Sequence, residues 1–131
     1  MKSSDTRLSV LERQKFGWTH ADAGGFMSTA WKLPEQLTGI IGSHLDVDAL
    51  LDNFEGQPEK ATVALSAFLP VVAHEEWKER EQFLRYFATL FAGKANLHKA
   101  VFDKVDSEFE QYARIIQVNK PKISLLSYVE E

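Results

Sequence analysis

Two histidines, His20 and His44, lie near the ends of the segment FGWTHADAGGFMSTAWKLPEQLTGIIGSHLD. Neutral imidazoles bind divalent metal ions, and a bound metal with open positions activates water. A catalytic metal needs three or more protein ligands, for which Asp22 and Asp46 are the neighbouring candidates. Asp22 is more simply explained as a charge at the start of a helix. The same two histidines can instead form a half-buried pair bonded to each other or to backbone, or a contact that responds to pH.

Two helices joined by a short turn are predicted to position these histidines. One helical face carries residues spaced by four, three and four: His20, Gly24, Met27 and Trp31. Pro34 suits the first turn of the next helix, because its missing N–H costs nothing there. At roughly 1.5 Å per residue, His20 and His44 both lie about 15 Å from the turn. The spacing therefore allows the two imidazoles to meet at the open end of an antiparallel hairpin.

Glycines inside the first of these helices need a physical reason. A glycine there costs on the order of 1 kcal/mol of helix propensity relative to alanine. Gly24 lies on the inward face beside His20, which indicates close approach of another backbone at a crowded crossing. Gly25 points elsewhere, and the pattern does not explain it. We interpret Trp31 as a packing anchor before the turn, although Trp31 with Leu33 and Pro34 can also form a binding surface.

Helical spacing recurs along the whole chain, whereas strand signals are scarce. We expect helices over about 5–15, 19–31, 34–45, 58–69, 74–92 and 105–118, with short helical pieces near 46–53 and 123–131. In the first helix Leu8 and Leu11 are expected to point inward, and Gly17 to follow its end. Thr19 and Asp22 resemble a capping box. The fold class is all-α, a helical bundle of about six to seven helices in a single domain, 1–131.

Two of these helices carry marked apolar patterns. The helix starting near Pro58 is apolar nearly all round, so we expect it to be buried. The helix over 74–92 carries an aromatic stripe: Trp77, Leu84, Phe87 and Phe91. We interpret this stripe as core, with a partner groove or a dimer interface as the alternative.

Composition excludes several classes of function. The chain has 131 residues, a formal net charge of −4 and no cysteine. A mildly acidic chain disfavours nucleic-acid binding. The lack of cysteine rules out disulfides and cysteine-based zinc sites and suits a cytoplasmic protein. No apolar run is long enough to cross a membrane, and the start of the chain is not a signal peptide. No P-loop, GxGxxG or GxSxG motif is present.

The pattern H-x3-G-x6-W-x-L-P-x9-H is formed by His20, Gly24, Trp31, Leu33, Pro34 and His44. It resembles the HDOD domain, the regulatory branch of the HD phosphohydrolase superfamily, in the C-terminal part of that domain. The flanking segments LERQKFGWTH, ATVALSAFL and DSEFEQYARIIQV are similar to the same family. The chain departs from HD enzymes in two ways. Nothing before Leu8 supplies their His-Asp dyad, and Ser66 or Ala67 stands where their late metal-binding Asp would fall.

This resemblance implies a non-catalytic signalling module that needs no cofactor and acts through a protein partner or an upstream signalling domain. Self-association is a further expectation. The alternative is a remnant of a metal-dependent phosphohydrolase, in which His20, His44 and Asp46 hold a divalent metal. A third hypothesis is a sensor that binds a small ligand, such as a cyclic dinucleotide, in the same pocket.

Overall fold

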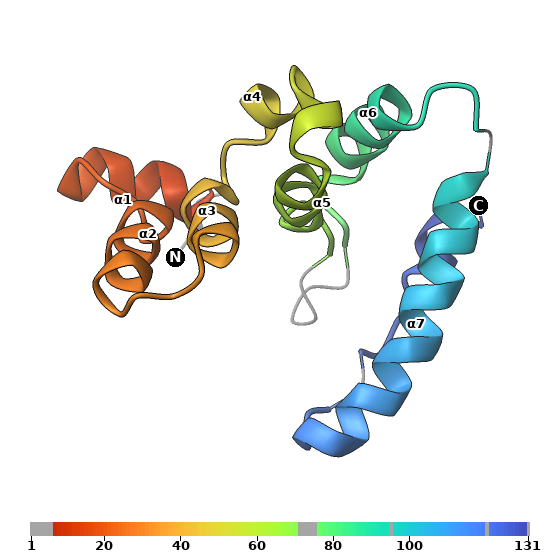
Figure 1. Cartoon of the computed structure of the whole chain (residues 1–131). Helices are drawn as coiled ribbons and strands as arrows, with labels where there is room; N and C mark the ends of the chain where they lie inside the picture. The colour runs from red at the N-terminus through yellow and green to blue at the C-terminus, as the bar shows by residue number, and fades with distance from the viewer. Residues whose placement is uncertain (1–6, 71–75, 95, 120, 131) are drawn as a thin grey trace. The chain divides into compact units, whose positions relative to one another are not determined.

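The computed structural model describes residues 7–70, 76–94, 96–119 and 121–130. Within these ranges the chain is all-helical and has no strand, which confirms the predicted class. Figure 1 shows the elements in chain order. The described α-helices are α1 (Leu8–Phe16), α2 (His20–Ala30), α3 (Glu35–Ser43), α4 (Val47–Leu51), α5 (Pro58–Ser66), α6 (Arg80–Leu90) and α7 (Leu97–Ile116). Two 3₁₀ helices, η1 (Phe54–Gly56) and η2 (Leu126–Val129), complete the set.

The chain divides into two compact units, Met1–Ala67 and Phe68–Glu131. The first unit holds α1 to α5, and the second holds α6, α7 and η2. The expectation of a single domain stays a prediction.

The join between α1 and α2 follows the predicted signals. Gly17 ends α1 in the left-handed region, at a φ of 78°, and its N–H donates to the Arg13 carbonyl. Thr19 then caps α2: its backbone N–H donates to the Asp22 carboxylate at 2.7 Å, and the Asp22 N–H donates back to the Thr19 hydroxyl at 3.4 Å. The capping box predicted at Thr19 and Asp22 is confirmed.

The turn between α2 and α3 is a Schellman motif. Lys32 adopts a φ of 58°, and its N–H donates to the Thr29 carbonyl at 3.0 Å. The next N–H, of Leu33, donates to the Ser28 carbonyl, also at 3.0 Å. This pair of bonds satisfies two carbonyls at the end of α2 and reverses the chain. Pro34 is the N-cap of α3, one residue earlier than the predicted helical position.

The packing of the first unit corrects two expectations. Leu8 and Leu11 are 64% and 40% exposed, so the prediction that they point inward is wrong. No residue of α1 is buried. The prediction that α5 is buried all round is only partly right. Ala61 and Ala64 are fully buried, whereas Val63 is exposed on the opposite side.

The second unit is built on aromatic side chains. Trp77 lies before α6, and its indole N–H donates to the buried Phe68 carbonyl at 2.7 Å. The Trp77 ring lies 5.2 Å from Phe83 and 5.8 Å from Phe102, measured between ring centroids. Trp77 and Phe87 are buried, so the core interpretation of the aromatic stripe is confirmed for these two residues. α6 begins at Arg80 rather than near 74, and residues 71–75 lie outside the described ranges.

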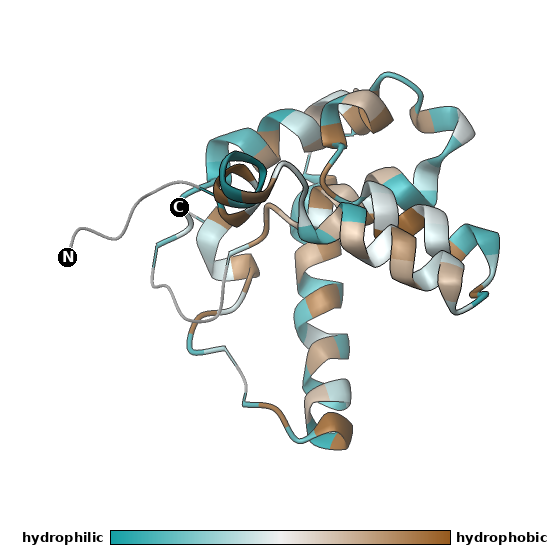
Figure 2. Cartoon of the chain, turned by 90° about the vertical axis from the view of Figure 1, so that its left-hand side faces the viewer, coloured by the Kyte–Doolittle hydropathy of each residue, from teal (hydrophilic) through white to brown (hydrophobic). Residues whose placement is uncertain are grey.

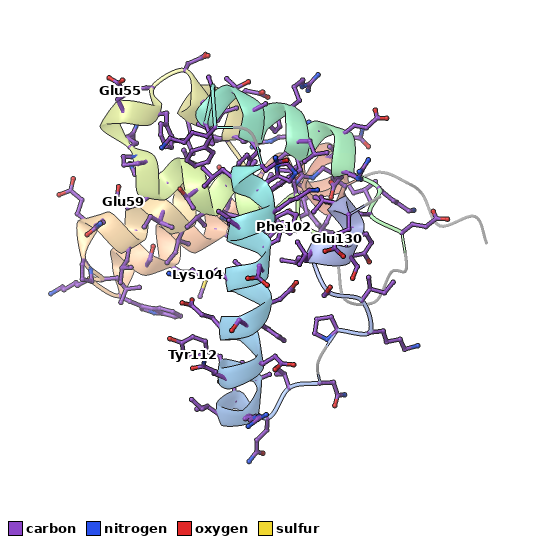
Figure 3. All side chains as sticks on the ribbon, turned by 90° about the vertical axis from the view of Figure 1, so that its right-hand side faces the viewer. Glu55, Glu59, Phe102, Lys104, Tyr112 and Glu130 are labelled. Atoms are coloured by element: carbon purple, nitrogen blue, oxygen red, sulfur yellow. The ribbon has the colours of Figure 1, made fainter. Side chains whose placement is uncertain are left out.

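α7 is longer than expected and unevenly covered. It begins at Leu97, eight residues before the predicted start at 105. Phe102, near its first turns, is 2% exposed, whereas Ile115, near its end, is 74% exposed. Figure 2 shows brown and teal residues alternating along this helix. Tyr112 is also exposed, and Figure 3 shows its side chain projecting from the lower part of α7.

A carboxylate on α7 holds the C-terminal segment. The two oxygens of Asp106 accept the backbone N–H groups of Leu125 and Leu126 at 2.9 and 3.0 Å. Arg80 adds a second tie, because its Nε donates to the Tyr128 carbonyl at 3.0 Å. The short helical piece predicted near 123–131 is confirmed as η2.

Candidate functional site

His20 and His44 meet at the open end of the α2–α3 hairpin. Their Nε2 atoms are 3.1 Å apart, and their ring centroids are separated by 5.1 Å. His20 is the first residue of α2, and His44 is the C-cap of α3. The two helices lie side by side in Figure 1, so the start of one reaches the end of the other. The predicted approach of the two imidazoles is confirmed.

Each imidazole also bonds through its second nitrogen. Nδ1 of His20 lies 2.7 Å from Oε2 of Glu12 on α1, and the same oxygen accepts the backbone N–H of His20 at 3.0 Å. Nδ1 of His44 lies 2.7 Å from the Ile41 carbonyl. A chain of hydrogen bonds therefore runs from α1 through the start of α2 to the end of α3.

Glu12 is the residue of this site that the sequence reasoning missed. The backbone N–H of His20 is one of the unpaired donors at the start of a helix, and an acidic side chain eight residues earlier can reach it across the Gly17 turn. That bond is the main cause of the lowered pKa of Glu12, and the bond from the His20 ring adds to it. Glu12 is thus held in its ionised form beside His20.

The crossing of α2 and α3 is made by glycines on both helices. A Cβ on Gly24 would lie 2.8 Å from Cγ2 of Ile41, and a Cβ on Gly25 would lie 3.1 Å from Cα of Gly42. The crowded crossing predicted at Gly24 is present, but there the neighbour is a side chain. The close backbone approach is at Gly25, for which the sequence offered no explanation.

The prediction that Trp31 is a packing anchor is wrong. Trp31 is 68% exposed, because it is the C-cap of α2 at the hairpin tip and not part of the face between α2 and α3. Leu33 and Leu37 beside it are also exposed, as is Pro34. The motif W-x-L-P thus supplies the turn. In it, the Leu33 N–H donates the Schellman bond that spans five residues, to the Ser28 carbonyl, and Pro34 caps α3.

Asp46 does not complete a metal site with the two histidines. It is the N-cap of α4, and its side chain is exposed. The Asp22 carboxylate is engaged by Thr19 and lies 3.4 Å from the Arg13 guanidinium. Nowhere among the described residues do three His, Cys, Asp or Glu side chains form a group that could hold a metal ion. Two imidazoles alone fall short of the three protein ligands that a catalytic metal needs.

A hollow of about 280 Å³ adjoins the residues that flank the histidine pair. It is formed by α1, the start of α2 and the end of α3, and its lining includes Val10, Arg13, Thr19, Asp22, Leu45 and Asp46. Arg13 also influences Asp22: the pKa of Asp22 is lowered mainly by the hydrogen bonds from Thr19 and further by this guanidinium. The hollow therefore has fixed charges of both signs on its walls.

Comparisons with family models, with curated proteins and with solved structures found no match to this chain. None of the described helices is both long enough and apolar enough to cross a membrane.

Proposed function

We propose that this chain is a non-catalytic regulatory module that works through contacts with a protein partner or with another signalling domain. The observation that carries the proposal is a group of exposed apolar side chains around the α2–α3 turn. We call it the turn patch, and its members are Met27, Trp31, Leu33 and Leu37. Met27 and Trp31 are one helical turn apart on α2, and the other two follow directly across the turn.

Exposure of this kind suits recognition of a protein. Contiguous apolar surface on a folded domain marks interaction sites, and tryptophan is enriched among the residues that dominate binding energy. The turn patch is also preorganised, because the Schellman motif fixes its turn and the glycine crossing fixes the two helices. A rigid patch loses little conformational entropy on binding.

Charge supports a protein rather than a nucleic acid as the partner. The net charge is −4, and a nucleic-acid surface needs clustered positive charge. A cytoplasmic location is part of the proposal, since the chain has no cysteine. Self-association through the same patch remains an alternative mode of contact.

The phosphohydrolase alternative finds less support. It needs His20, His44 and Asp46 to share a metal, and Asp46 does not join the histidines among the described residues. A small-ligand sensor is supported only by the hollow beside the pair, whose walls carry charges of both signs.

A photo-crosslinking amino acid placed at Trp31, in cells that contain the full-length chain, tests the proposal. We expect a discrete crosslinked protein that is lost when Leu37 is also changed to Ser. The matched control carries the crosslinker at Ile115, which is 74% exposed but lies on the second unit, and it should not capture the same protein. Metal-dependent turnover of a phosphodiester by the purified chain, abolished in His44→Gln, would overturn the proposal in favour of the hydrolase.

A further inference from the structure

The hydrogen bonds around His20 and His44 determine where their protons must be. A backbone carbonyl only accepts hydrogen bonds, so Nδ1 of His44, 2.7 Å from the Ile41 carbonyl, must carry a proton. An ionised carboxylate also only accepts, and Glu12 is held ionised by the bonds that lower its pKa. Nδ1 of His20, 2.7 Å from that carboxylate, must therefore carry a proton as well.

With both Nδ1 atoms protonated, the two Nε2 atoms of His20 and His44 cannot both lack a proton at their observed separation. A neutral imidazole has a single N–H, so two neutral rings with protonated Nδ1 atoms would present bare lone pairs at both Nε2 atoms. The Nε2 atoms of His20 and His44 are 3.1 Å apart, which is a hydrogen-bond distance. Two acceptors at that distance repel each other unless a proton lies between them.

We propose that His20 and His44 share one additional proton between their Nε2 atoms and so form a pH-dependent latch at the open end of the α2–α3 hairpin. The pair then holds three protons on its four ring nitrogens and carries a single positive charge, which the Glu12 carboxylate balances. Loss of the shared proton removes the bond between the start of α2 and the end of α3. The proposal is independent of the regulatory function proposed above.

The surrounding charges favour this arrangement. Glu12 on α1 is the charged group in direct contact with the pair. Arg13 and Asp22 lie 3.4 Å from each other and largely offset one another, and Asp46 follows His44 by two residues with its side chain exposed. His44 caps the C-terminus of α3, where the helix dipole favours a positive charge. His20 begins α2, where the dipole disfavours one, and there the carboxylate of Glu12 compensates.

The latch joins the two helices at the end of the hairpin that lies beyond the glycine crossing. The crossing at Gly25 and Gly42 holds the middle of the hairpin, so release of the histidines frees its open end. The hollow described above borders that end, since Thr19, Asp22 and Leu45 belong to its lining. Release of the latch therefore acts on the end of the hairpin that borders the hollow and not on the turn patch.

Nitrogen-15 NMR of the full chain labelled on its histidine rings tests the proposal. We expect both Nδ1 atoms of the pair to be protonated at neutral pH, together with a scalar coupling between the two Nε2 nuclei across the shared hydrogen bond. The coupling should disappear at alkaline pH, and the two rings should change in one concerted step. His98, whose ring packs on Phe87 in the second unit, is the internal reference and should show no such coupling.

Two substitutions complete the test. In Glu12→Gln the side-chain amide can donate to Nδ1 of His20, so that ring can become neutral with its proton on Nε2. The pair then needs only two protons, and we expect the third proton to be lost at a lower pH than in the parent chain. In folded His44→Gln the coupling must vanish. A spectrum of the parent chain at neutral pH with a bare Nδ1 on either ring would overturn the proposal, as would independent titration of the two rings.

Discussion

A Cβ atom built on Gly25 would lie 3.1 Å from the Cα of Gly42, which puts the backbones of α2 and α3 in direct contact. The relationship is not symmetric. A Cβ on Gly42 would lie 3.6 Å from the Cα of Gly25, an ordinary van der Waals distance. The same crossing therefore has one position where a methyl group is crowded and one where it fits at an ordinary distance.

The first prediction compares alanine at these two positions. Alanine gains about 1 kcal/mol of helix propensity over glycine. We expect Gly42→Ala to raise the free energy of unfolding by up to that amount. Gly25→Ala must push two backbones apart, and overpacking of this kind costs about 1–3 kcal/mol, so a net loss is expected. Urea unfolding followed by circular dichroism measures both variants. Equal effects of the two substitutions would contradict the asymmetry.

The second prediction concerns the strained turn at Lys32. Its φ of 58° is in the left-handed region, which costs a non-glycine residue roughly 1–2 kcal/mol. Glycine adopts this conformation freely and is the usual residue at this position of a Schellman motif. Lys32→Gly should therefore raise the free energy of unfolding by about 1 kcal/mol. Lys32→Ala is the control: it removes the charge but keeps the strain, so its stability should stay near that of the parent.

The third prediction is a loss of stability in acid. The pKa values of Glu12 and Asp22 are lowered from their ordinary 4.5 and 3.8 by hydrogen bonds from His20 and Thr19. A carboxyl whose pKa is lowered in the folded state stabilises it above its ordinary pKa, and this contribution is lost as the pH falls through the lowered value. Stability should thus decline below about pH 4.5, with a weaker dependence in Asp22→Asn. If the free energy of unfolding of Asp22→Asn fell as steeply in acid as that of the parent chain, the Thr19–Asp22 capping box would not contribute to stability as proposed.

The sequence predicted the ends and caps of helices better than it predicted which side chains are exposed to solvent. Gly17, the capping box at Thr19 and the meeting of His20 with His44 follow from residue type and spacing within one or two helices. Local chemistry fixes these features, so a single sequence contains them. Leu8 and Trp31 were expected to be covered, yet both are exposed. Whether an apolar side chain is covered depends on which distant elements reach it.

Glu12 and Gly25 show why part of the site escaped prediction. The bonds that His20 makes to Glu12 span the Gly17 turn, and their geometry depends on the conformations of both Gly17 and Thr19. To predict the contact of Gly25 with Gly42, one would need to know the register of α2 against α3 to within one residue. Helical periodicity gives the face of a helix but not that register, so it indicated Gly24 and left Gly25 unexplained.

The fourth prediction uses two tryptophans with opposite surroundings. Trp77 is buried, and its indole N–H donates to the Phe68 carbonyl at 2.7 Å, whereas Trp31 is 68% exposed. Trp77→Phe removes the indole hydrogen bond to the Phe68 carbonyl and leaves a smaller ring against Phe83 and Phe102, which together should cost about 1–3 kcal/mol. Trp31→Phe should change the free energy of unfolding by no more than about 0.5 kcal/mol. Thermal and urea unfolding of the two variants in parallel measures the contrast. A larger loss in Trp31→Phe would show that Trp31 is covered in solution, which would remove the exposed turn patch as the basis of partner binding.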